Sequence, residues 1–233
     1  MNLKPLPESE NSFFENLELI NIHSHIGIQK ENSICIVNHL ANFSNIPPCE
    51  YVSLGIHPCA ISAHGVSENF SKLCKAADAP NVLAIGECGL DKLCSVDLEL
   101  QKIWFTAQLE LGISLKKPIV IHCVRAFSEI LEILEKKSLS APLIFHGFNR
   151  NLCLANQLLS KGYFLSMGAG LKHKNIQEIC KKIPAERLFL ETDSAEVSIE
   201  EIYRLAALAR ETSLHALSKQ IKQNFQQVFG THI

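Results

Sequence analysis

The stretch Leu19–Ile28 reads Leu-Ile-Asn-Ile-His-Ser-His-Ile-Gly-Ile, an apolar run that ends in two histidines spaced two residues apart. Side chains at positions i and i+2 of an extended strand point to the same face of the sheet. His23 and His25 can therefore converge on one point at the end of a strand, as metal ligands must. A core histidine followed by a turn histidine would give the same short motif, so the rest of the chain has to distinguish the two readings.

Short apolar runs like this one recur eight times along the chain, and each has the length of a strand rather than of a helix. The runs are Leu19–His23, Ser33–Val37, Tyr51–His57, Val82–Glu87, Pro118–His122, Leu143–His146, Gly162–Ser166 and Arg187–Asp193. Their apolarity is continuous rather than alternating, which is typical of strands buried on both faces. The pattern therefore predicts a parallel sheet.

Apolar stripes at helical spacing lie between the later runs. One helix is expected to begin after Asp97 as its N-cap, and another at Ser198, whose spacing from Glu201 is that of a capping box. Further helices are expected over Phe127–Leu134, Leu152–Leu159, Ile176–Ile183 and about Leu214–Phe229. Strands and helices therefore alternate along most of the chain.

This alternation predicts a compact (β/α)₈ TIM barrel, formed as a single domain by residues 1–233. The connections Gln29–Asn32 and His39–Glu50 are too short or too irregular for full helices, so the outer helices should be reduced after the first two strands. An open doubly wound sheet is the alternative architecture.

The composition excludes several classes of function. The net charge of −2 argues against extensive binding to the backbone of duplex DNA, but it permits a small site for a strand end or a phosphorylated metabolite.

The nine cysteines include no Cys-x-x-Cys pair, which predicts that the protein has no disulfide framework and is located in a reducing cytoplasm. Neither a signal peptide nor a membrane span is expected, and no obligate protein partner is evident.

Polar residues suited to metal binding stand at the ends of the predicted strands. They are His23, His25, His57, Glu87, His122, His146 and Asp193. In a barrel these strand ends share one rim, where active sites of this architecture lie. Burying so many unpaired imidazoles and carboxylates would be costly, so a pair of metal ions is the simplest explanation of their convergence.

Four imidazoles (His23, His25, His122, His146) and two carboxylates (Glu87, Asp193) are enough ligands for two divalent ions. Imidazole with carboxylate suits zinc, manganese or iron, and magnesium is a further candidate. Glu87 is expected to bridge the two ions, whose bound water becomes the nucleophile. Asp193 is the best candidate to accept and deliver protons.

Three further cationic features have two readings each. His57 can contact a substrate phosphate or hold the turn before Pro58. Arg125, three residues beyond His122, can fork onto a phosphate or remain a solvated loop charge, and Arg150 is a weaker version of the same idea. The lysines around His173, namely Lys172, Lys174, Lys181 and Lys182, form a solvated helix face or attract a polyanion.

Six motifs resemble those of one family, in the family's order and over nearly the whole chain. They are Asn21-Ile22-His23-Ser24-His25, Gly55-Ile56-His57-Pro58, Ala84-Ile85-Gly86-Glu87-Cys88-Gly89-Leu90-Asp91, Ile121-His122-Cys123, Phe145-His146-Gly147-Phe148 and Leu190-Glu191-Thr192-Asp193. Asn224 and Phe229 resemble the family's closing helix signature. The chain thus resembles the TatD family of metal-dependent hydrolases.

The resemblance implies a (β/α)₈ barrel with two metals and deoxyribonuclease or related phosphodiester hydrolysis. By position, it implies that His23, His25, Glu87, His122, His146 and Asp193 are the metal ligands. The loops depart from the family pattern at Asn21, Gly27, Val124–Ala126, Gly147–Asn149 and Ser194–Glu196. The motifs therefore support metal-dependent chemistry better than they support DNA as the natural substrate.

Three functions follow from these patterns. The first is a two-metal phosphoesterase that acts on a DNA strand end or a small phosphodiester. The second is an amidohydrolase-type enzyme acting on an amide or lactone. Such enzymes often bridge their metals through a modified lysine, whereas the bridging position here is Glu87. The third is a non-catalytic metal-binding barrel, which the intact ligand set disfavours.

Overall fold

The structure, a computed structural model, describes residues 14, 17–26, 33–40, 43, 46–47, 51–62 and 65–230. The chain forms two compact units, one comprising residues 1–35 and 147–233 (unit 1) and the other residues 36–146 (unit 2). Predictions for the amino-terminal stretch, Gly27, the Gln29–Asn32 connection and most of the His39–Glu50 connection lie outside the described residues.

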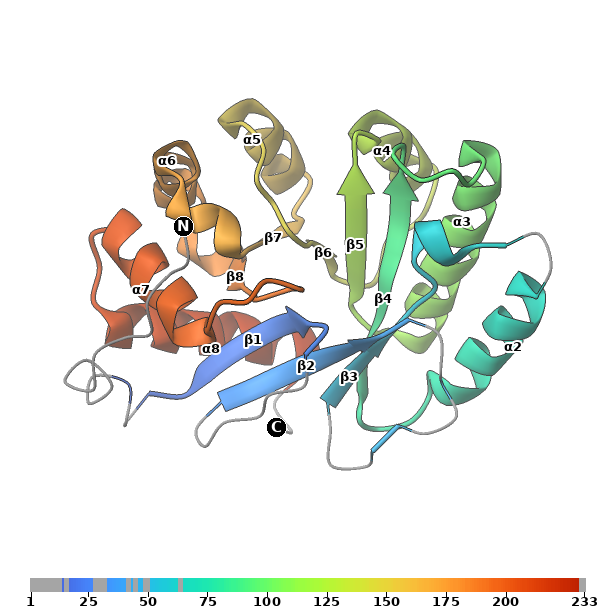
Figure 1. Cartoon of the computed structure of the whole chain (residues 1–233), viewed down its shortest axis with the longest axis horizontal. Helices are drawn as coiled ribbons and strands as arrows, with labels where there is room; N and C mark the ends of the chain where they lie inside the picture. The colour runs from blue at the N-terminus through green and yellow to red at the C-terminus, as the bar shows by residue number, and fades with distance from the viewer. Residues whose placement is uncertain are drawn as a thin grey trace. The chain divides into compact units, whose positions relative to one another are not determined.

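Unit 2 carries a parallel sheet whose strands are neighbours in chain order. The strands are β2 (Ser33–His39, in this unit from Ile36), β3 (Tyr51–Leu54), β4 (Val82–Asp91), β5 (Ile119–Val124) and β6 (Leu143–Phe145). Figure 1 shows β4 and β5 as adjacent arrows pointing the same way. Because all five strands are parallel, their carboxyl ends lie at the same edge of this sheet.

Strand β4 is longer than predicted and places Glu87 inside the strand rather than at its end. The pairing with β5 is irregular between Ile85 and Cys88 and then continues to Asp91. Gly89 permits this continuation, because a Cβ there would lie 1.9 Å from the His122 carbonyl oxygen. The prediction that this strand ends at Glu87 is therefore wrong. β3 and β8, in contrast, end earlier than the apolar runs that predicted them.

Helices follow the later strands of unit 2. They are the 3-10 helix η1 (Pro58–Ala60) and the α-helices α2 (Val66–Ala76), α3 (Leu98–Leu115) and α4 (Phe127–Glu135). The predicted N-cap is confirmed, since the Asp97 side chain accepts a hydrogen bond from Leu100 N at 3.0 Å. α2 was not predicted, although Val66, Phe70 and Leu73 have helical spacing.

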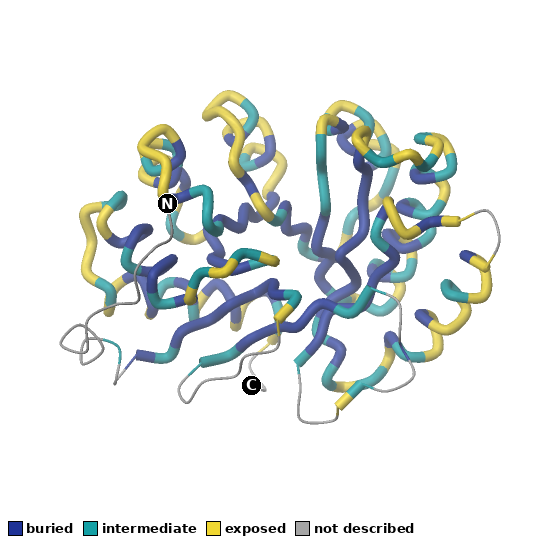
Figure 2. Tube along the Cα trace, viewed as in Figure 1, coloured by how far each residue is buried: buried dark blue, intermediate teal, exposed yellow. Residues whose placement is uncertain are grey.

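The core of unit 2 lies between the sheet and α2 and α3. Leu54, Ile56, Leu73 and Val82 are buried there, and Trp104 of α3 packs against this cluster. In Figure 2 the strands are dark blue along most of their length, whereas the outer faces of the helices are exposed. The continuous apolar runs therefore mark strands covered on both faces, as predicted.

Unit 1 places the first strand beside the last. β7 (Phe164–Met167) pairs in parallel with β8 (Leu188–Leu190). β1 (Leu19–Ser24) lies beside the residues that follow β8, where Ser24 forms a parallel bridge with Asp193. First and last strands that are neighbours are the arrangement of a closed barrel rather than of an open doubly wound sheet.

The helices of unit 1 agree with the predicted stripes. They are α5 (Leu152–Ser160), η2 (Ala169–Lys172), α6 (Lys174–Lys182), η3 (Ala185–Arg187), α7 (Ile199–Ala209) and α8 (Leu214–Phe229). Ser198 caps α7 as predicted, because its hydroxyl accepts from Glu201 N at 3.3 Å. The Glu201 carboxylate differs from the expected capping box, since it forms an ion pair with Arg204.

Two side chains fasten the last helices to the strands of unit 1. The Tyr203 hydroxyl of α7 accepts from Ile20 N at 3.0 Å and donates to Ile20 O at 3.2 Å, and burial raises the pKa of Tyr203. The Asn224 amide of α8 donates to Ala185 O and Leu188 O, both at 2.8 Å. These bonds fix the amino-terminal ends of β1 and β8, opposite to the strand ends that carry predicted ligands.

The cysteines follow the prediction except for one pair. A disulfide joins Cys59 to Cys94, with their Cα atoms 5.3 Å apart, whereas the other cysteines in the described part of the chain are thiols. Sequence spacing does not indicate this pair, because residues 59 and 94 meet only through the fold. Among the described helices, none combines the length and the apolar composition that crossing a bilayer requires.

Candidate metal centre

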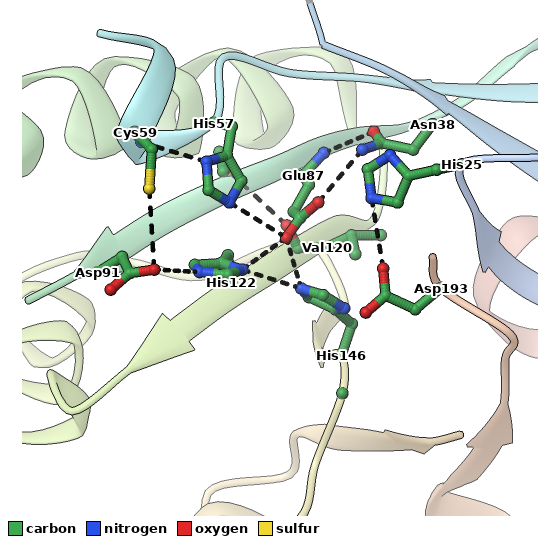
Figure 3. Close-up of polar contacts among 12 residues, drawn as sticks. His25, Asn38, His57, Cys59, Glu87, Asp91, Val120, His122, His146 and Asp193 are labelled. Carbon is green, nitrogen blue, oxygen red and sulfur yellow. Dashed lines mark hydrogen bonds and ion pairs between the residues drawn. The ribbon is translucent and has the colours of Figure 1, made fainter. Parts of the chain in front are cut away.

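The predicted ligands form two groups, one in each unit. The unit 1 group contains His23, His25 and Asp193, and the unit 2 group contains His57, Glu87, His122 and His146. Figure 3 shows His25 turned toward Asp193, and separately the rings of His57, His122 and His146 turned toward Glu87. The ligand residues therefore come together within each unit, and each group has its own local geometry.

In the unit 1 group, two imidazoles approach one carboxylate oxygen. Asp193 Oδ1 lies 3.3 Å from His25 Nε2 and 3.7 Å from His23 Nε2. The His23 side chain is fully buried, whereas 37% of the Asp193 side chain is exposed. All three ligand atoms lie within 4.8 Å of one another, close enough for a single ion to contact them together. The group therefore combines a buried anchor with a carboxylate that solvent can reach.

Backbone pairing holds the unit 1 group in place. His25 N donates to Asp193 O at 3.1 Å, and Asp193 N donates to His23 O at 3.0 Å. Asp193 has a φ of 54°, in the left-handed region that aspartate tolerates better than most residues. Asn21 reinforces the contact, because its amide donates to Thr192 Oγ1 at 2.8 Å and its carbonyl oxygen accepts from Thr192 N.

In the unit 2 group, three imidazoles surround one oxygen of Glu87. Oε1 of Glu87 lies 2.5 Å from His122 Nδ1, 2.8 Å from His146 Nε2 and 3.6 Å from His57 Nε2. Only 4% of the Glu87 side chain is exposed. His122 Nδ1 and His146 Nε2 are themselves 3.3 Å apart, so the ring nitrogens of both histidines face one small volume.

Asn38 positions Glu87 and was missed by the sequence analysis. Its carbonyl oxygen accepts from Glu87 N at 2.9 Å and from Ser53 Oγ at 3.1 Å. Its amide donates to Glu87 Oε2 at 3.3 Å, which leaves Oε1 for the histidines. The other residues were selected because they stand at the end of an apolar run, a criterion we call the strand-end rule. This rule would also have found Asn38, because it directly follows the second apolar run.

Asp91 is the second residue that the sequence analysis did not assign. Its Oδ2 lies 3.1 Å from Nε2 of His122, on the ring edge opposite to Glu87. A carboxylate on one ring nitrogen fixes the proton there and leaves the other nitrogen to ligate a metal. Asp91 therefore gives His122 the tautomer whose Nδ1 lone pair faces Glu87.

These contacts show that the donor set fits a divalent cation. With its proton on Nε2, His122 turns Nδ1, a nitrogen that can ligate a metal, toward Glu87 Oε1 at 2.5 Å, so both atoms can bind one cation. Imidazole nitrogen with carboxylate oxygen is the ligand mixture that zinc and related ions take. In both groups the residues present therefore suit a metal ion.

His57 has one of the two roles that the sequence left open, since it holds the turn before Pro58. Its Nδ1 accepts a hydrogen bond from Cys59 N at 3.1 Å, which caps η1 and holds the turn. The neutral ring then carries its proton on Nε2, the nitrogen that faces Glu87 and can donate to a substrate oxygen. Burial, together with the nearby His122, lowers the pKa of His57 to about 4. The His57 ring is therefore neutral and directs Nε2 at Glu87, and its contact with a substrate phosphate stays a prediction.

Arg125 lies apart from the ligand contacts. It is exposed between β5 and α4, with a φ of 55°. No hydrogen bond from its side chain to a described ligand residue was found, so its role in phosphate binding stays a prediction.

One hollow opens beside Asp193 in unit 1, and a second hollow adjoins the first. The first, of about 200 Å³, is lined by Gly147–Asn149, Gly168–Gly170 and Glu191–Ala195. The second, of about 560 Å³, shares Asn149, Ala169 and Gly170 with the first and is also lined by Arg150, Lys172 and His173. Arg150, Lys172 and His173 thus line one hollow that adjoins the one lined by Asp193, whereas Lys174, Lys181 and Lys182 are not among its lining residues.

Comparisons with known proteins identify a family and relatives to which this chain is similar. The family model described as "TatD related DNase" matches residues 25–230. A protein named an uncharacterized metal-dependent hydrolase from Buchnera aphidicola is 27% identical over 86% of this chain and 87% of its own length. A protein named 3′-5′ ssDNA/RNA exonuclease TatD from Erwinia tasmaniensis is 33% identical over 60% of this chain and 56% of its own length.

A solved structure supports the predicted architecture. The TatD homologue YjjV from Escherichia coli superposes with a TM-score of 0.81 at 19% identity, over 92% of this chain and 99% of that protein. This likeness confirms the predicted (β/α)₈ barrel fold. With a family model that matches most of its length, the chain belongs to the TatD family of metal-dependent hydrolases.

Proposed function

We propose that this protein hydrolyses phosphodiester bonds at the end of a DNA strand, with one divalent ion bound by each of the two groups. The observation that carries the proposal is the convergence of ring nitrogens on Glu87 Oε1, with His122 Nδ1 at 2.5 Å and His146 Nε2 at 2.8 Å. Zinc, manganese and magnesium are the candidate ions, and the bridging role of Glu87 stays a prediction.

Divalent ions in these groups would lower the pKa of a bound water and neutralise charge on a phosphoryl oxygen. Asp193 is assigned to accept the proton of the attacking water, because its side chain is part-exposed while its backbone is fixed between His23 and His25. His57 is assigned to donate its Nε2–H to a phosphate oxygen. Both assignments follow from the hydrogen-bonding capacity of the Asp193 and His57 side chains. Neither side chain has to change its hydrogen-bond partners in order to act.

The hollows beside Asp193 favour a nucleic-acid substrate over a small neutral ester. Arg150, Lys172 and His173 line the larger hollow, which adjoins the one that Asp193 lines. A strand whose scissile phosphate lies at Asp193 would meet these side chains with its neighbouring phosphates. The names of the Erwinia exonuclease and of the deoxyribonuclease Tat-D from Schizosaccharomyces pombe agree with such a substrate. A small phosphodiester is the remaining substrate class, and a cytoplasmic location without an obligate protein partner stays a prediction.

The proposal is tested by assaying metal-free protein reloaded with Mg²⁺, Mn²⁺ or Zn²⁺. The substrates are single-stranded DNA labelled at either end, the matching duplex, a chromogenic phosphodiester, and a panel of lactones and amides. We expect metal-dependent shortening of the single strand from one end. Turnover of a lactone or amide without cleavage of any phosphodiester would support the amidohydrolase reading instead.

The variant Asp193→Asn tests the assigned proton acceptor. We expect kcat to fall by about 10² to 10⁴, the range that a positioned general base contributes, while the fold is kept. Asp78→Asn is the matched control, since Asp78 is exposed on the surface of unit 2. Elemental analysis of both variants separates a lost base from a lost metal, and full turnover by metal-loaded Asp193→Asn would remove Asp193 from this role.

A further inference from the structure

A third cluster of metal-binding side chains lies in unit 2, outside the predicted ligand set. It contains Cys59, Asp91 and Cys94, whose sulfur and carboxylate atoms lie within 4.8 Å of one another. Cys59 Sγ is 3.8 Å from Asp91 Oδ2, a contact that Figure 3 marks with a dashed line. The disulfide places Cys94 Sγ beside Cys59 Sγ. None of the roles assigned above uses the two cysteines.

The backbone around this cluster keeps the three side chains together without help from the disulfide. Asp91 O accepts from Cys94 N at 3.3 Å, and Asp91 Oδ1 accepts from Leu93 N at 2.7 Å, so the turn after β4 is folded against the carboxylate. On the other side, His57 holds Cys59 N in η1. Breaking the S–S bond therefore leaves two thiols that still face Asp91.

The sulfur pair is open to reagents in solution, because Cys59 is exposed and Cys94 is part-exposed. A dithiol reductant reaches such a bond and reduces it by exchange. Its two S–H hydrogens pass to the cysteine sulfurs, and the reductant leaves as its own disulfide. The exposed Cys74 and Cys153 are thiols in the same chain, so a dithiol state of this pair is chemically consistent with its surroundings.

We propose that the reduced Cys59–Cys94 pair, together with Asp91, binds a thiophilic divalent ion, with Zn²⁺ as the best match. Two thiolates and a carboxylate oxygen are common zinc ligands, and the ion usually takes four ligands in a tetrahedron. Binding releases the two thiol protons to solvent. Because Cys59 is exposed, a water completes the fourth position.

The proposed site is coupled through Asp91 to His122 of the unit 2 group. Oδ2 of Asp91 lies 3.1 Å from His122 Nε2 and 3.8 Å from Cys59 Sγ, so one oxygen serves both sides. A carboxylate oxygen has lone pairs for both partners. An ion on the thiolates would therefore share its carboxylate with the histidine that faces Glu87.

The test measures metal binding and does not depend on hydrolysis. Protein reduced with excess dithiol is freed of the reductant, loaded with Zn²⁺ alone and analysed for metal content. We expect wild type to bind about one more equivalent than Cys59→Ser/Cys94→Ser. The double variant Cys74→Ser/Cys153→Ser is the matched control, since it removes two exposed thiols that do not face a carboxylate, and it should bind as much as wild type.

Cobalt supplies the second readout, because a Co²⁺–thiolate bond gives a charge-transfer absorption in the near ultraviolet. Wild type and the control should show this band, and Cys94→Ala, which keeps Cys59 in place, should lose most of it. Equal zinc content in wild type and the Cys59→Ser/Cys94→Ser variant would overturn the proposal. So would a cobalt spectrum without the thiolate band. Failure of the nuclease assay would leave both results unaffected.

Discussion

Asp91 Oδ2 and Nε2 of His122 are 3.1 Å apart, on the side of the imidazole opposite to Glu87. This contact makes Asp91 a positioning residue for His122. Asp91→Asn should weaken metal binding at the unit 2 group about 10- to 100-fold, the usual effect of losing such a partner. Calorimetric titration in the Cys59→Ser/Cys94→Ser background measures this loss without the proposed thiolate site. Asp97→Asn keeps a good helix cap and should bind metal as wild type does.

Gly89→Ala should disrupt the pairing of β4 with β5. A Cβ at position 89 would lie 1.9 Å from the His122 carbonyl oxygen, and the residue has a φ of 154°. We expect a loss of about 3 kcal/mol in the free energy of unfolding, measured by denaturant titration. Gly162→Ala has a positive φ but no atom within 4 Å of its Cβ, so it should lose only about 1 kcal/mol. Equal losses in both would show that strain at φ, rather than the clash, is what matters.

Arg150→Ala/Lys172→Ala should weaken binding of single-stranded DNA and reduce its salt dependence. Each phosphate contact on a single strand contributes about 0.7 to the slope of log K against log salt, so the slope should fall by about 1.4. Anisotropy titrations at several salt concentrations measure it. Lys181→Ala/Lys182→Ala on α6 removes as much charge outside the hollow, and an equal change there would point to net charge alone.

Asn224→Ala should loosen the start of β8 in unit 1. The amide of Asn224 is 1% exposed and donates to both Ala185 O and Leu188 O. Leaving these carbonyls without their donor should cost about 2 kcal/mol in the free energy of unfolding. The exposed Asn175→Ala should change it by no more than about 0.5 kcal/mol, and a similar loss in both would argue against this role.

Lys117→Met should change how stability depends on pH. Burial lowers the pKa of Lys117 from its ordinary value of 10.5, and its ammonium donates to Ala77 O and Ala79 O. Between the lowered pKa and 10.5, the unfolded chain binds more protons than the native chain, so this group adds stability as pH rises. Wild type should therefore gain stability in alkaline buffer relative to Lys117→Met. The exposed Lys136→Met should follow wild type.

The strand-end rule predicted most of the candidate site from the sequence. His23, His122 and His146 end or follow apolar runs, and the parallel strands bring such ends to one edge of each sheet. The rule needed only the order of runs and their polarity. It succeeded because the position of a residue along its strand decides at which edge its side chain emerges.

Other residues depend on information that local patterns lack. Asp91 meets His122 because β4 continues beyond its irregular pairing and sets Gly89 opposite His122. Such register is fixed by contacts across strands rather than by the period of apolar residues. Cys59 and Cys94 likewise meet only through the turn after β4 and the capped helix η1.

α2 was missed for a different reason. Its N-cap is Gly65, which has a φ of 93° and supplies no side-chain cap, so the usual N-terminal signal is absent. Only Val66 and Leu73 of the helix are buried, and the remaining surface is largely polar. Packing against the core of unit 2 stabilises this helix more than its own sequence indicates.

Unit 1 is assembled from the two ends of the chain, with all of unit 2 between them. On the ribosome, His23 and His25 emerge long before Asp193, so the nascent chain must carry its first strand without the last one. α8 anchors β8 through Asn224 only after the chain has been made well beyond Asp193. The unit 1 ligand group can consequently assemble only after all of unit 2 has been translated.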